Sequence, residues 1–97
     1  MKGGWVYILA SKRNGTLYVG VTANLPARLM QHREGRNRGF TAKYRVFLLV
    51  HAEFFERIEE AIGREKAIKK WRRAWKLELI ERGNPDWKDL FEHIIGA

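Results

Sequence analysis

The chain has 97 residues, of which 45% are hydrophobic and 12% aromatic, enough for one modest core and too few for a second. This composition excludes intrinsic disorder, and the lack of cysteine excludes disulfides, thiol chemistry and cysteine-ligated metal sites. The formal net charge of +8 indicates a polyanionic partner, most often nucleic acid, although a solubility device or attraction to a membrane surface would also account for it.

Two runs rich in strand formers, residues 5–10 and 17–22, are predicted to form a β-hairpin. Asn14-Gly15 between them is the favoured dipeptide of a two-residue turn. A turn of that length would pair residue 7 with 22 and residue 11 with 18. Tyr7 and Tyr18 would then emerge on one face of the sheet, whereas a three-residue loop would put them on opposite faces.

A helix is predicted over residues 24–34, because Asn24 suits the N-cap and Gly35 ends the pattern. One stripe of this helix faces the core and carries Leu25, Arg28, Leu29 and His32. Arg28 and His32 are therefore neighbours, one turn apart. Each has an ordinary interpretation as well, a cation that reaches water or a carboxylate and a hydrogen-bonded core histidine.

The second half of the chain is predicted to hold one strand and several helices. Residues 35–43 are expected to form a loop and residues 45–55 a third strand, whose apolar run at 46–50 is typical of a central strand. Residues 56–82 have a helical composition with a break at 71–73.

Residues 83–85, Gly-Asn-Pro, end the helical region, and a short last helix is expected from residue 85 or 86 to 95. The order β-β-α-β-α-α, with a short C-terminal helix, predicts a single α+β domain over residues 1–97. Its three-stranded sheet, mixed or antiparallel, has flanking helices. No apolar run approaches the roughly 20 residues of a membrane span, and the N-terminus lacks a signal peptide's apolar core, so we expect a cytoplasmic protein without a membrane partner.

Glu65 interrupts an otherwise apolar helical stripe. The apolar residues of that stripe are Ile58, Ala61, Ile62, Ile68, Trp75 and Leu79. A buried carboxylate needs a compensating partner, so Glu65 requires either a salt bridge, to Arg28 or Lys69, or a metal ion.

Most of the cations gather in two clusters. The first comprises Arg28, Arg33, Arg36, Arg38, Lys43 and Arg45, and the second comprises Arg64, Lys66, Lys69, Lys70, Arg72, Arg73 and Lys76. Phosphate contacts by such residues weaken steeply with salt and carry little sequence information. Trp71 and Trp75 in the second cluster are either core residues or platforms on which exposed bases stack.

These residues are arranged as in the GIY-YIG nuclease superfamily, and the chain resembles its small single-domain bacterial branch. The resemblance rests on Trp5-Val6-Tyr7, Tyr18-Val19-Gly20, the pair Arg28 and His32, the segment 64–69 around Glu65, and Asn84 before Pro85. It covers residues 5 to about 90. Trp5 replaces the glycine of the first motif, and Val21 stands where the DNA-repair branch carries a lysine.

The resemblance implies hydrolysis of phosphodiester bonds with one divalent cation, Mg²⁺ or Mn²⁺, held by Glu65. Tyr18 would be the general base on an attacking water, assisted by Tyr7, while Arg28 offsets charge on the phosphate. His32 would hydrogen-bond in the same pocket, and Asn84 would help to orient it. Substrate contacts are expected from Gly20, where backbone and substrate approach closely, and from Arg36, Arg38, Lys43, Lys69 and Arg72.

The expected function is therefore a metal-dependent endonuclease, acting on DNA in repair or recombination, with RNA left open as a substrate. We expect no appended recognition domain, so substrate choice would rest on backbone shape or on a partner protein for targeting. The alternative is a nucleic-acid-binding module that keeps the same fold with weak catalysis or none.

Overall fold

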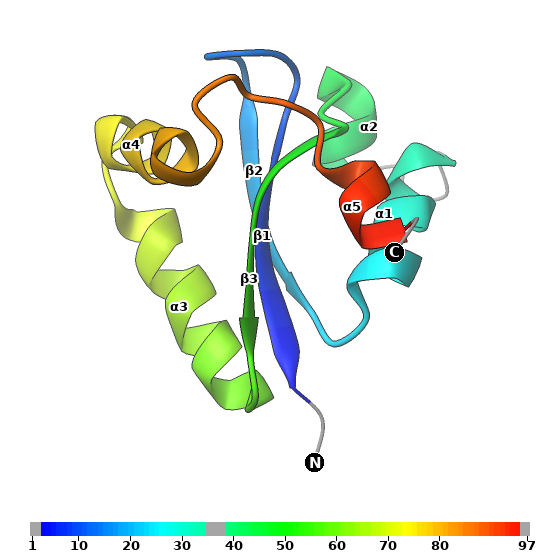
Figure 1. Ribbon diagram of the computed structural model, residues 1–97, viewed down its shortest axis with the longest axis vertical. Helices are drawn as coiled ribbons and strands as arrows, with labels where there is room; N and C mark the ends of the chain where they lie inside the picture. The colour runs from blue at the N-terminus through cyan, green and yellow to red at the C-terminus, as the bar shows by residue number, and fades with distance from the viewer. Residues whose placement is uncertain (1–2, 35–38, 96–97) are drawn as a thin grey trace.

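The computed structural model describes residues 3–34 and 39–95 and shows an α+β fold (Figure 1). Its elements are, in chain order, β1 (Gly4–Ala10), β2 (Leu17–Thr22), α1 (Leu25–Arg33), α2 (Phe40–Tyr44), β3 (Leu48–Phe55), α3 (Ile58–Lys70), α4 (Arg73–Gly83) and α5 (Phe91–Ile95). The predicted break at residues 71–73 is confirmed, since α3 ends and α4 begins there. Within the described ranges, no helix has the length and apolar character to cross a membrane.

The three strands form one antiparallel sheet in the order β2-β1-β3. The prediction that residues 46–50 lie in a central strand is wrong, because β1 is central and β3 is an edge strand that begins only at Leu48. Arg45 ends α2 with a φ of 56°, which turns the chain before the strand starts. Val46, Leu49 and Val50 of this run are buried nonetheless, because helices cover both faces and the amide of Leu90 donates to Leu49 O at 2.7 Å along the edge.

The β1-β2 hairpin differs from the predicted register by two residues. Tyr7 lies opposite Gly20, and Leu9 lies opposite Tyr18. The loop is longer than the Asn-Gly pair, since the amide of Ser11 donates to Thr16 O at 3.0 Å. A shift of two residues preserves the face of every side chain, so the prediction that Tyr7 and Tyr18 share a face is confirmed.

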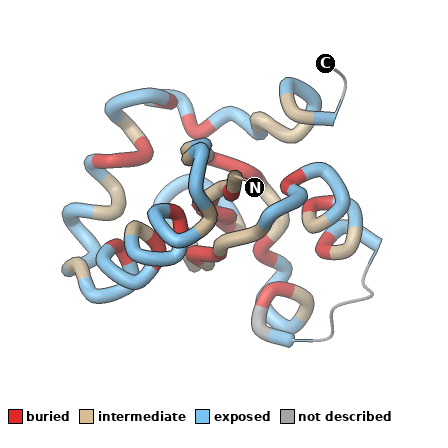
Figure 2. Tube along the Cα trace, turned by 90° about the horizontal axis from the view of Figure 1, so that it is seen from below, coloured by how far each residue is buried: buried red, intermediate tan, exposed pale blue. Residues whose placement is uncertain are grey.

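Helices cover the sheet on both sides. In Figure 1, α3 and α4 lie on the left of the sheet and α1, α2 and α5 on the right. The α3 side holds a core built on Val6, Ile8, Ala10, Val19, Val50, Ala61, Ile68, Leu79, Ile80 and Trp87. The α1 side holds a second core of Tyr7, Leu9, Leu25, Leu29, Val46 and Leu49. Figure 2 shows buried positions concentrated where the helices face the sheet.

Three further predictions about the helices need correction. Residues 40–43 of the predicted loop belong to α2, and the last helix begins at Phe91 rather than at residue 85 or 86. Ile62 and Trp75, placed on the apolar stripe of one long helix, are exposed. Trp75 is exposed because the backbone at Trp71 is extended, with φ −68° and ψ 150°. This break changes the direction of α4, so the apolar stripe of α3 does not continue along α4.

Candidate active site

The hydroxyl of Tyr7 is the centre of a buried hydrogen-bonded network between β1 and α1. It accepts a hydrogen bond from Arg28 Nε at 3.3 Å and is hydrogen-bonded to His32 Nε2 at 3.1 Å. The other ring nitrogen of His32 lies 3.0 Å from Thr41 Oγ1 on α2. Tyr7, His32 and Thr41 are almost fully buried, so these partners replace the water that each group loses.

Helix α1 positions Arg28 and His32 in this network. Asn24 caps the helix through its side chain, which accepts from the amide of Ala27 at 3.2 Å, and Leu25 and Leu29 anchor the same face in the core. The predicted helix and its core-facing stripe are therefore confirmed. Arg28 and His32 are one helical turn apart. Arg28 therefore contacts the phenolic oxygen of Tyr7 from one side, and His32 contacts it from the other.

The surroundings of Tyr7, His32 and Arg28 determine their protonation states near neutral pH. Burial raises the pKa of Tyr7 to about 12; the hydrogen bond from Arg28 opposes that rise, and Tyr18 adds to it. Burial, followed by the charge of Arg28, lowers the pKa of His32 to about 4. The hydrogen bond to Tyr7 raises the pKa of Arg28 against the opposing effect of burial. Tyr7 is therefore a neutral phenol, His32 a neutral imidazole and Arg28 a cation.

Tyr18 lies beside this network, on the edge strand β2. Its ring centroid is 6.2 Å from that of Tyr7 and 5.6 Å from that of His32, and it also interacts with Arg28. Tyr18 lines a hollow of about 310 Å³ together with Leu17, Val19, Lys69 and Lys76. The structure thus brings four of the predicted catalytic residues, Tyr7, Tyr18, Arg28 and His32, into one cluster beside an open hollow.

Gly20 makes room for the ring of Tyr7. A Cβ atom at position 20 would lie 2.5 Å from the Tyr7 Cζ and hydroxyl oxygen and 2.9 Å from Tyr18 Cε2. Such contacts are far inside van der Waals separation, so only glycine fits beneath this ring. The group that approaches Gly20 closely is the Tyr7 ring, and the predicted contact of Gly20 with substrate stays a prediction.

Glu65 lies on α3 and is 8% exposed, which confirms its predicted burial. Its Oε2 pairs with Lys69 Nζ at 2.5 Å, one of the two salt bridges predicted; the pairing with Arg28 is not formed. In the part of the chain that the structure describes, Oε1 accepts no hydrogen bond. Because Lys69 lines the hollow beside Tyr18, Glu65 reaches the same end of β2 from the α3 side.

The donor set around Glu65 limits which cation it could hold. No group of three or more His, Cys, Asp or Glu side chains that could bind a metal occurs among residues 3–34 and 39–95. A cation here would have a single protein carboxylate and would keep most of its water. That fits Mg²⁺ or Mn²⁺, which bind one or two carboxylates with waters and phosphate oxygens, and does not fit zinc in a structural site.

Residues 3–78 match the family profile described as the GIY-YIG catalytic domain. The chain belongs to the GIY-YIG nuclease family. The match spans the polar cluster and Glu65, and it ends before Asn84. GIY-YIG membership also agrees with the antiparallel three-stranded sheet and its flanking helices.

Relatives of this GIY-YIG chain are small proteins of similar length. It is 40% identical over 77 residues to a UPF0213 protein of Staphylococcus haemolyticus, covering 79% of this chain and 93% of the relative. It is 39% identical over 87 residues to a UPF0213 protein of Syntrophus aciditrophicus, covering 89% and 98%. The solution NMR structure of a UPF0213 protein from Bacillus halodurans superposes with a TM-score of 0.57 at 26% identity, covering 93% and 95%.

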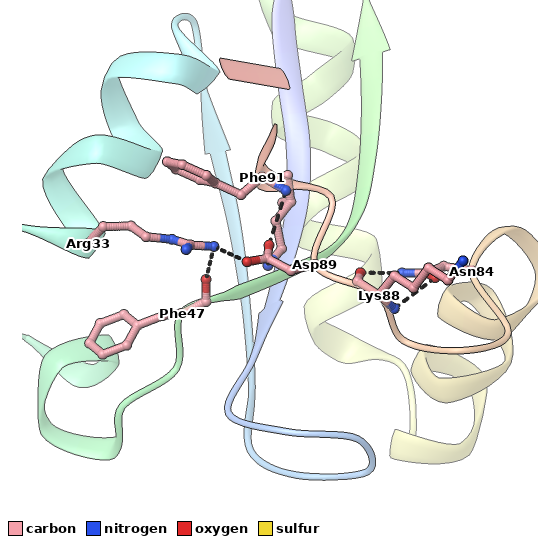
Figure 3. Close-up of polar contacts among 7 residues, drawn as sticks. Arg33, Phe47, Asn84, Lys88, Asp89 and Phe91 are labelled. Carbon is pink, nitrogen blue, oxygen red and sulfur yellow. Dashed lines mark hydrogen bonds and ion pairs between the residues drawn. The ribbon is translucent and has the colours of Figure 1, made fainter. Parts of the chain in front are cut away.

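Asn84 lies apart from the GIY-YIG cluster, at the β3 side of the sheet (Figure 3). Its Nδ2 donates to Val50 O at 3.2 Å and to Lys88 O at 2.8 Å, and its Oδ1 accepts from the amide of Lys88 at 3.0 Å. Since β1 separates β3 from β2, these bonds anchor the C-terminal segment on the edge opposite Tyr18. The predicted catalytic role of Asn84 stays a prediction.

The predicted substrate-binding cations have varied surroundings. Lys43 lies over the ring of Tyr44 at 5.4 Å, and Arg72 lies over Trp75 at 5.1 Å. Arg36 and Arg38 lie outside the described residues.

Several other cations of the two clusters are bound to protein groups. Arg33 pairs with Asp89, Arg64 with Glu53, and Arg73 donates to the carbonyls of Asn14 and Gly15 in the hairpin loop. These three stabilise the fold, so fewer side chains remain for phosphates than the sequence suggested.

Sequence reasoning missed Thr41, Glu53 and Asp89. Thr41 lies in a segment predicted to be a loop, where nothing marked it as a partner of His32. The carboxylate of Glu53 accepts from Arg64 at 2.9 and 3.0 Å and from His51 at 2.7 Å. Burial alone would raise the pKa of Glu53, but its hydrogen bonds with Arg64 and His51 outweigh burial and lower it. Strand alternation from His51 to Glu53 was the signal that could have placed these two together.

Proposed function

We propose that this protein is a metal-dependent endonuclease that hydrolyses phosphodiester bonds of DNA. The observation that carries the proposal is the cluster in which Arg28 and His32 hold the hydroxyl of Tyr7 while Tyr18 faces the adjoining hollow. Among residues 3–34 and 39–95, Arg28 forms no salt bridge with a carboxylate, and its guanidinium also donates to Gln31 Oε1 at 3.2 Å. Its charge therefore remains available to a phosphate.

In this mechanism Tyr18 takes the proton of the attacking water. The base is the phenolate form of Tyr18, which becomes a phenol as it accepts this proton. Tyr7 stays protonated because burial raises its pKa to about 12, so its O–H can donate to the phenolate oxygen of Tyr18 and stabilise that charge before the proton arrives. Arg28 offsets the charge that develops on the phosphate. The roles of Tyr7 and Arg28 use the protonation states that their surroundings already favour.

His32 and Thr41 allow the hydroxyl of Tyr7 to change direction. When Tyr7 donates to His32 Nε2, the imidazole carries its proton on Nδ1 and donates to Thr41 Oγ1. When Tyr7 turns toward Tyr18, Nε2 must donate instead, and Nδ1 accepts from the Thr41 hydroxyl. A neutral imidazole between two hydroxyls satisfies both arrangements, which explains why a histidine suits this position.

Glu65 would hold the divalent cation, Mg²⁺ or Mn²⁺, by a single carboxylate. When bound there, the cation would polarise a phosphoryl oxygen and stabilise the leaving group. Lys69, half exposed and paired with Glu65, would release the carboxylate and turn toward the phosphate. This role places Lys69 among the substrate-binding residues.

A nicking assay on supercoiled plasmid with Mg²⁺ or Mn²⁺ tests the proposal. Wild-type protein should nick the plasmid, whereas Glu65→Gln should bind DNA but not cut it. Glu59→Gln is the matched control, because Glu59 is an exposed acid on the same helix. Equal cutting by Glu65→Gln and wild type would contradict the metal assignment. Salt-sensitive binding without cleavage of branched, flapped, single-stranded or duplex DNA would favour the binding module instead.

We further propose that the protein works in the cytoplasm, in DNA repair or recombination, with a partner protein for targeting. The absence of cysteine fits a reducing compartment. A site that contacts the phosphate backbone supplies little sequence discrimination, which is the reason for invoking a partner. Co-purification of a tagged chain with a DNA-processing protein would support this role, and recovery with unrelated partners alone would contradict it.

A further inference from the structure

A second hollow lies at the junction of α3 and α4, away from the tyrosine cluster. It has a volume of about 280 Å³ and is lined by Arg64, Trp71, Trp75, Glu78, Leu79 and Arg82. Trp75 is 49% exposed, an unusual state for so large an apolar side chain. The proposed phosphodiester chemistry uses none of these six residues.

The two indole rings form a corner. Their centroids lie 6.1 Å apart and their planes meet at 79°, so one ring can act as a floor and the other as a wall. Trp71 packs on the core, and the guanidinium of Arg64 lies 5.2 Å from its ring. Two hydrogen bonds to Glu53 hold Arg64 in place. The corner is therefore rigid on its Trp71 side, while Trp75 stays open to solvent.

The size and rim of the hollow favour a small flat ligand with polar edges. Its volume falls just below the roughly 300–1,000 Å³ of pockets for drug-sized ligands. Glu78 offers an acceptor and Arg82 offers donors, which matches the edge groups of a nucleobase. Arg72 lies 5.1 Å from the Trp75 ring, and guanidinium planes and indoles are both surfaces on which bases stack.

The charge around the hollow favours a nucleic-acid strand over an apolar peptide. Lys66, Lys70 and Arg72 are exposed on the same helix junction, in a chain with a net charge of +8. Paired bases cannot enter such a corner, because their faces are covered by their neighbours in the duplex. Only an unpaired base has both a free face and a free edge.

We propose that the Trp71–Trp75 corner is a stacking site for one unpaired base of a bound DNA strand. This inference rests on the proposed function, and it names the substrate class as DNA with a single-stranded portion.

Fluorescence anisotropy tests the site in EDTA, where no cutting occurs. The probes are a labelled single-stranded oligonucleotide and a blunt duplex of equal length. Trp75→Ala should weaken single-strand binding roughly 5- to 100-fold and duplex binding much less, whereas Trp75→Phe should retain most of the affinity. Phe54→Ala is the control, because Phe54 is an exposed aromatic residue on β3 that the hollow does not include.

Indole NMR signals give a second readout that does not depend on a variant. Adding the single-stranded oligonucleotide should shift the Nε1–H signals of Trp71 and Trp75, and it should leave that of Trp87, buried and bonded to Glu81 at 2.8 Å, in place. Unchanged single-strand binding by Trp75→Ala, which a peptide-binding role predicts, would overturn the proposal. Equal losses for both probes would also overturn it. A wild type that binds but never cuts would contradict the nuclease proposal alone.

Discussion

The Nε2 atom of His32 lies 3.1 Å from the hydroxyl oxygen of Tyr7, and both side chains are almost completely buried. This bond joins α1 to the central strand and fixes the phenol that packs beside Tyr18. Arg28 reaches the same oxygen at 3.3 Å. One buried hydroxyl therefore connects the fold to the proposed chemistry.

Tyr7→Phe should lower both stability and cutting. Removing the hydroxyl leaves His32 Nε2 and Arg28 Nε without this partner, and an unsatisfied buried polar group costs about 1–3 kcal/mol. Urea unfolding should show a loss of that size. The nicking rate should fall as well, since Tyr18 loses its donor. Tyr44→Phe, on a tyrosine that is 47% exposed, should cost less stability than Tyr7→Phe and leave the nicking rate near wild type. A Tyr7→Phe protein as stable as wild type would contradict the network.

Stability should fall as the pH is lowered from about 6.5 to about 4. His32 has a pKa near 6.5 in the unfolded chain and about 4 in the folded chain. Between these two pH values the unfolded state binds more protons, so lowering the pH stabilises the unfolded state relative to the folded state. The loss is at most about 3 kcal/mol. It should be complete near pH 4, and above pH 6.5 His32 should contribute no pH dependence.

His32→Gln isolates that contribution. Glutamine keeps a donor and an acceptor but does not titrate, so the free energy of unfolding should vary less between pH 6.5 and 4 in this variant. The imidazole signals of wild-type His32 should titrate near pH 4 in NMR spectra. Titration near pH 6.5 would show that the imidazole is not buried as described.

Gly20→Ala should disturb the Tyr7 ring. The added methyl would lie 2.5 Å from two atoms of that ring, and overpacking of this kind costs typically 1–3 kcal/mol. Gly63→Ala is the matched control, since a Cβ there meets nothing within 4 Å and alanine favours a helix by about 0.5–1 kcal/mol. In urea unfolding, the free energy of unfolding should therefore fall for Gly20→Ala and rise for Gly63→Ala. Equal effects would contradict the packing of Tyr7 on Gly20.

Asp89 anchors the C-terminal segment to α1 and β3 (Figure 3). Its Oδ2 pairs with Arg33 at 2.5 Å, and its Oδ1 accepts from the amides of Leu49 and Phe91 at 3.1 and 3.0 Å. Asp89→Ala should cost about 1–3 kcal/mol, whereas Asp89→Asn, which keeps an acceptor, should cost less. Hydrogen exchange at the Leu49 amide should accelerate most in Asp89→Ala. Unchanged exchange would contradict the anchor.

The part of the site built by local periodicity could be predicted from sequence. Helical spacing placed Arg28 beside His32, and strand alternation placed Tyr7 and Tyr18 on one face even though the loop length was wrong. The misplaced charge of Glu65 on an apolar stripe predicted its burial and its need for a compensating partner, for which Lys69 was one of the candidates. Each of these inferences needed only the geometry of one element or one hairpin.

The remainder depended on long-range contacts or on backbone breaks. Thr41 meets His32 only because residues 40–44 form a helical turn that their composition does not mark. Trp75 became exposed because two residues of extended backbone separate α3 from α4. The position of β3 at the edge depends on strand order, which an apolar run does not specify.

Tyr18→Phe in the nicking assay tests the central claim most directly. The substitution removes the hydroxyl and leaves the ring, so the protein should still fold and its DNA affinity should stay close to wild type. If Tyr18 is the general base, the rate of cutting with Mn²⁺ should fall roughly 10²- to 10⁴-fold. Cutting by Tyr18→Phe at the wild-type rate would contradict the proposed active site.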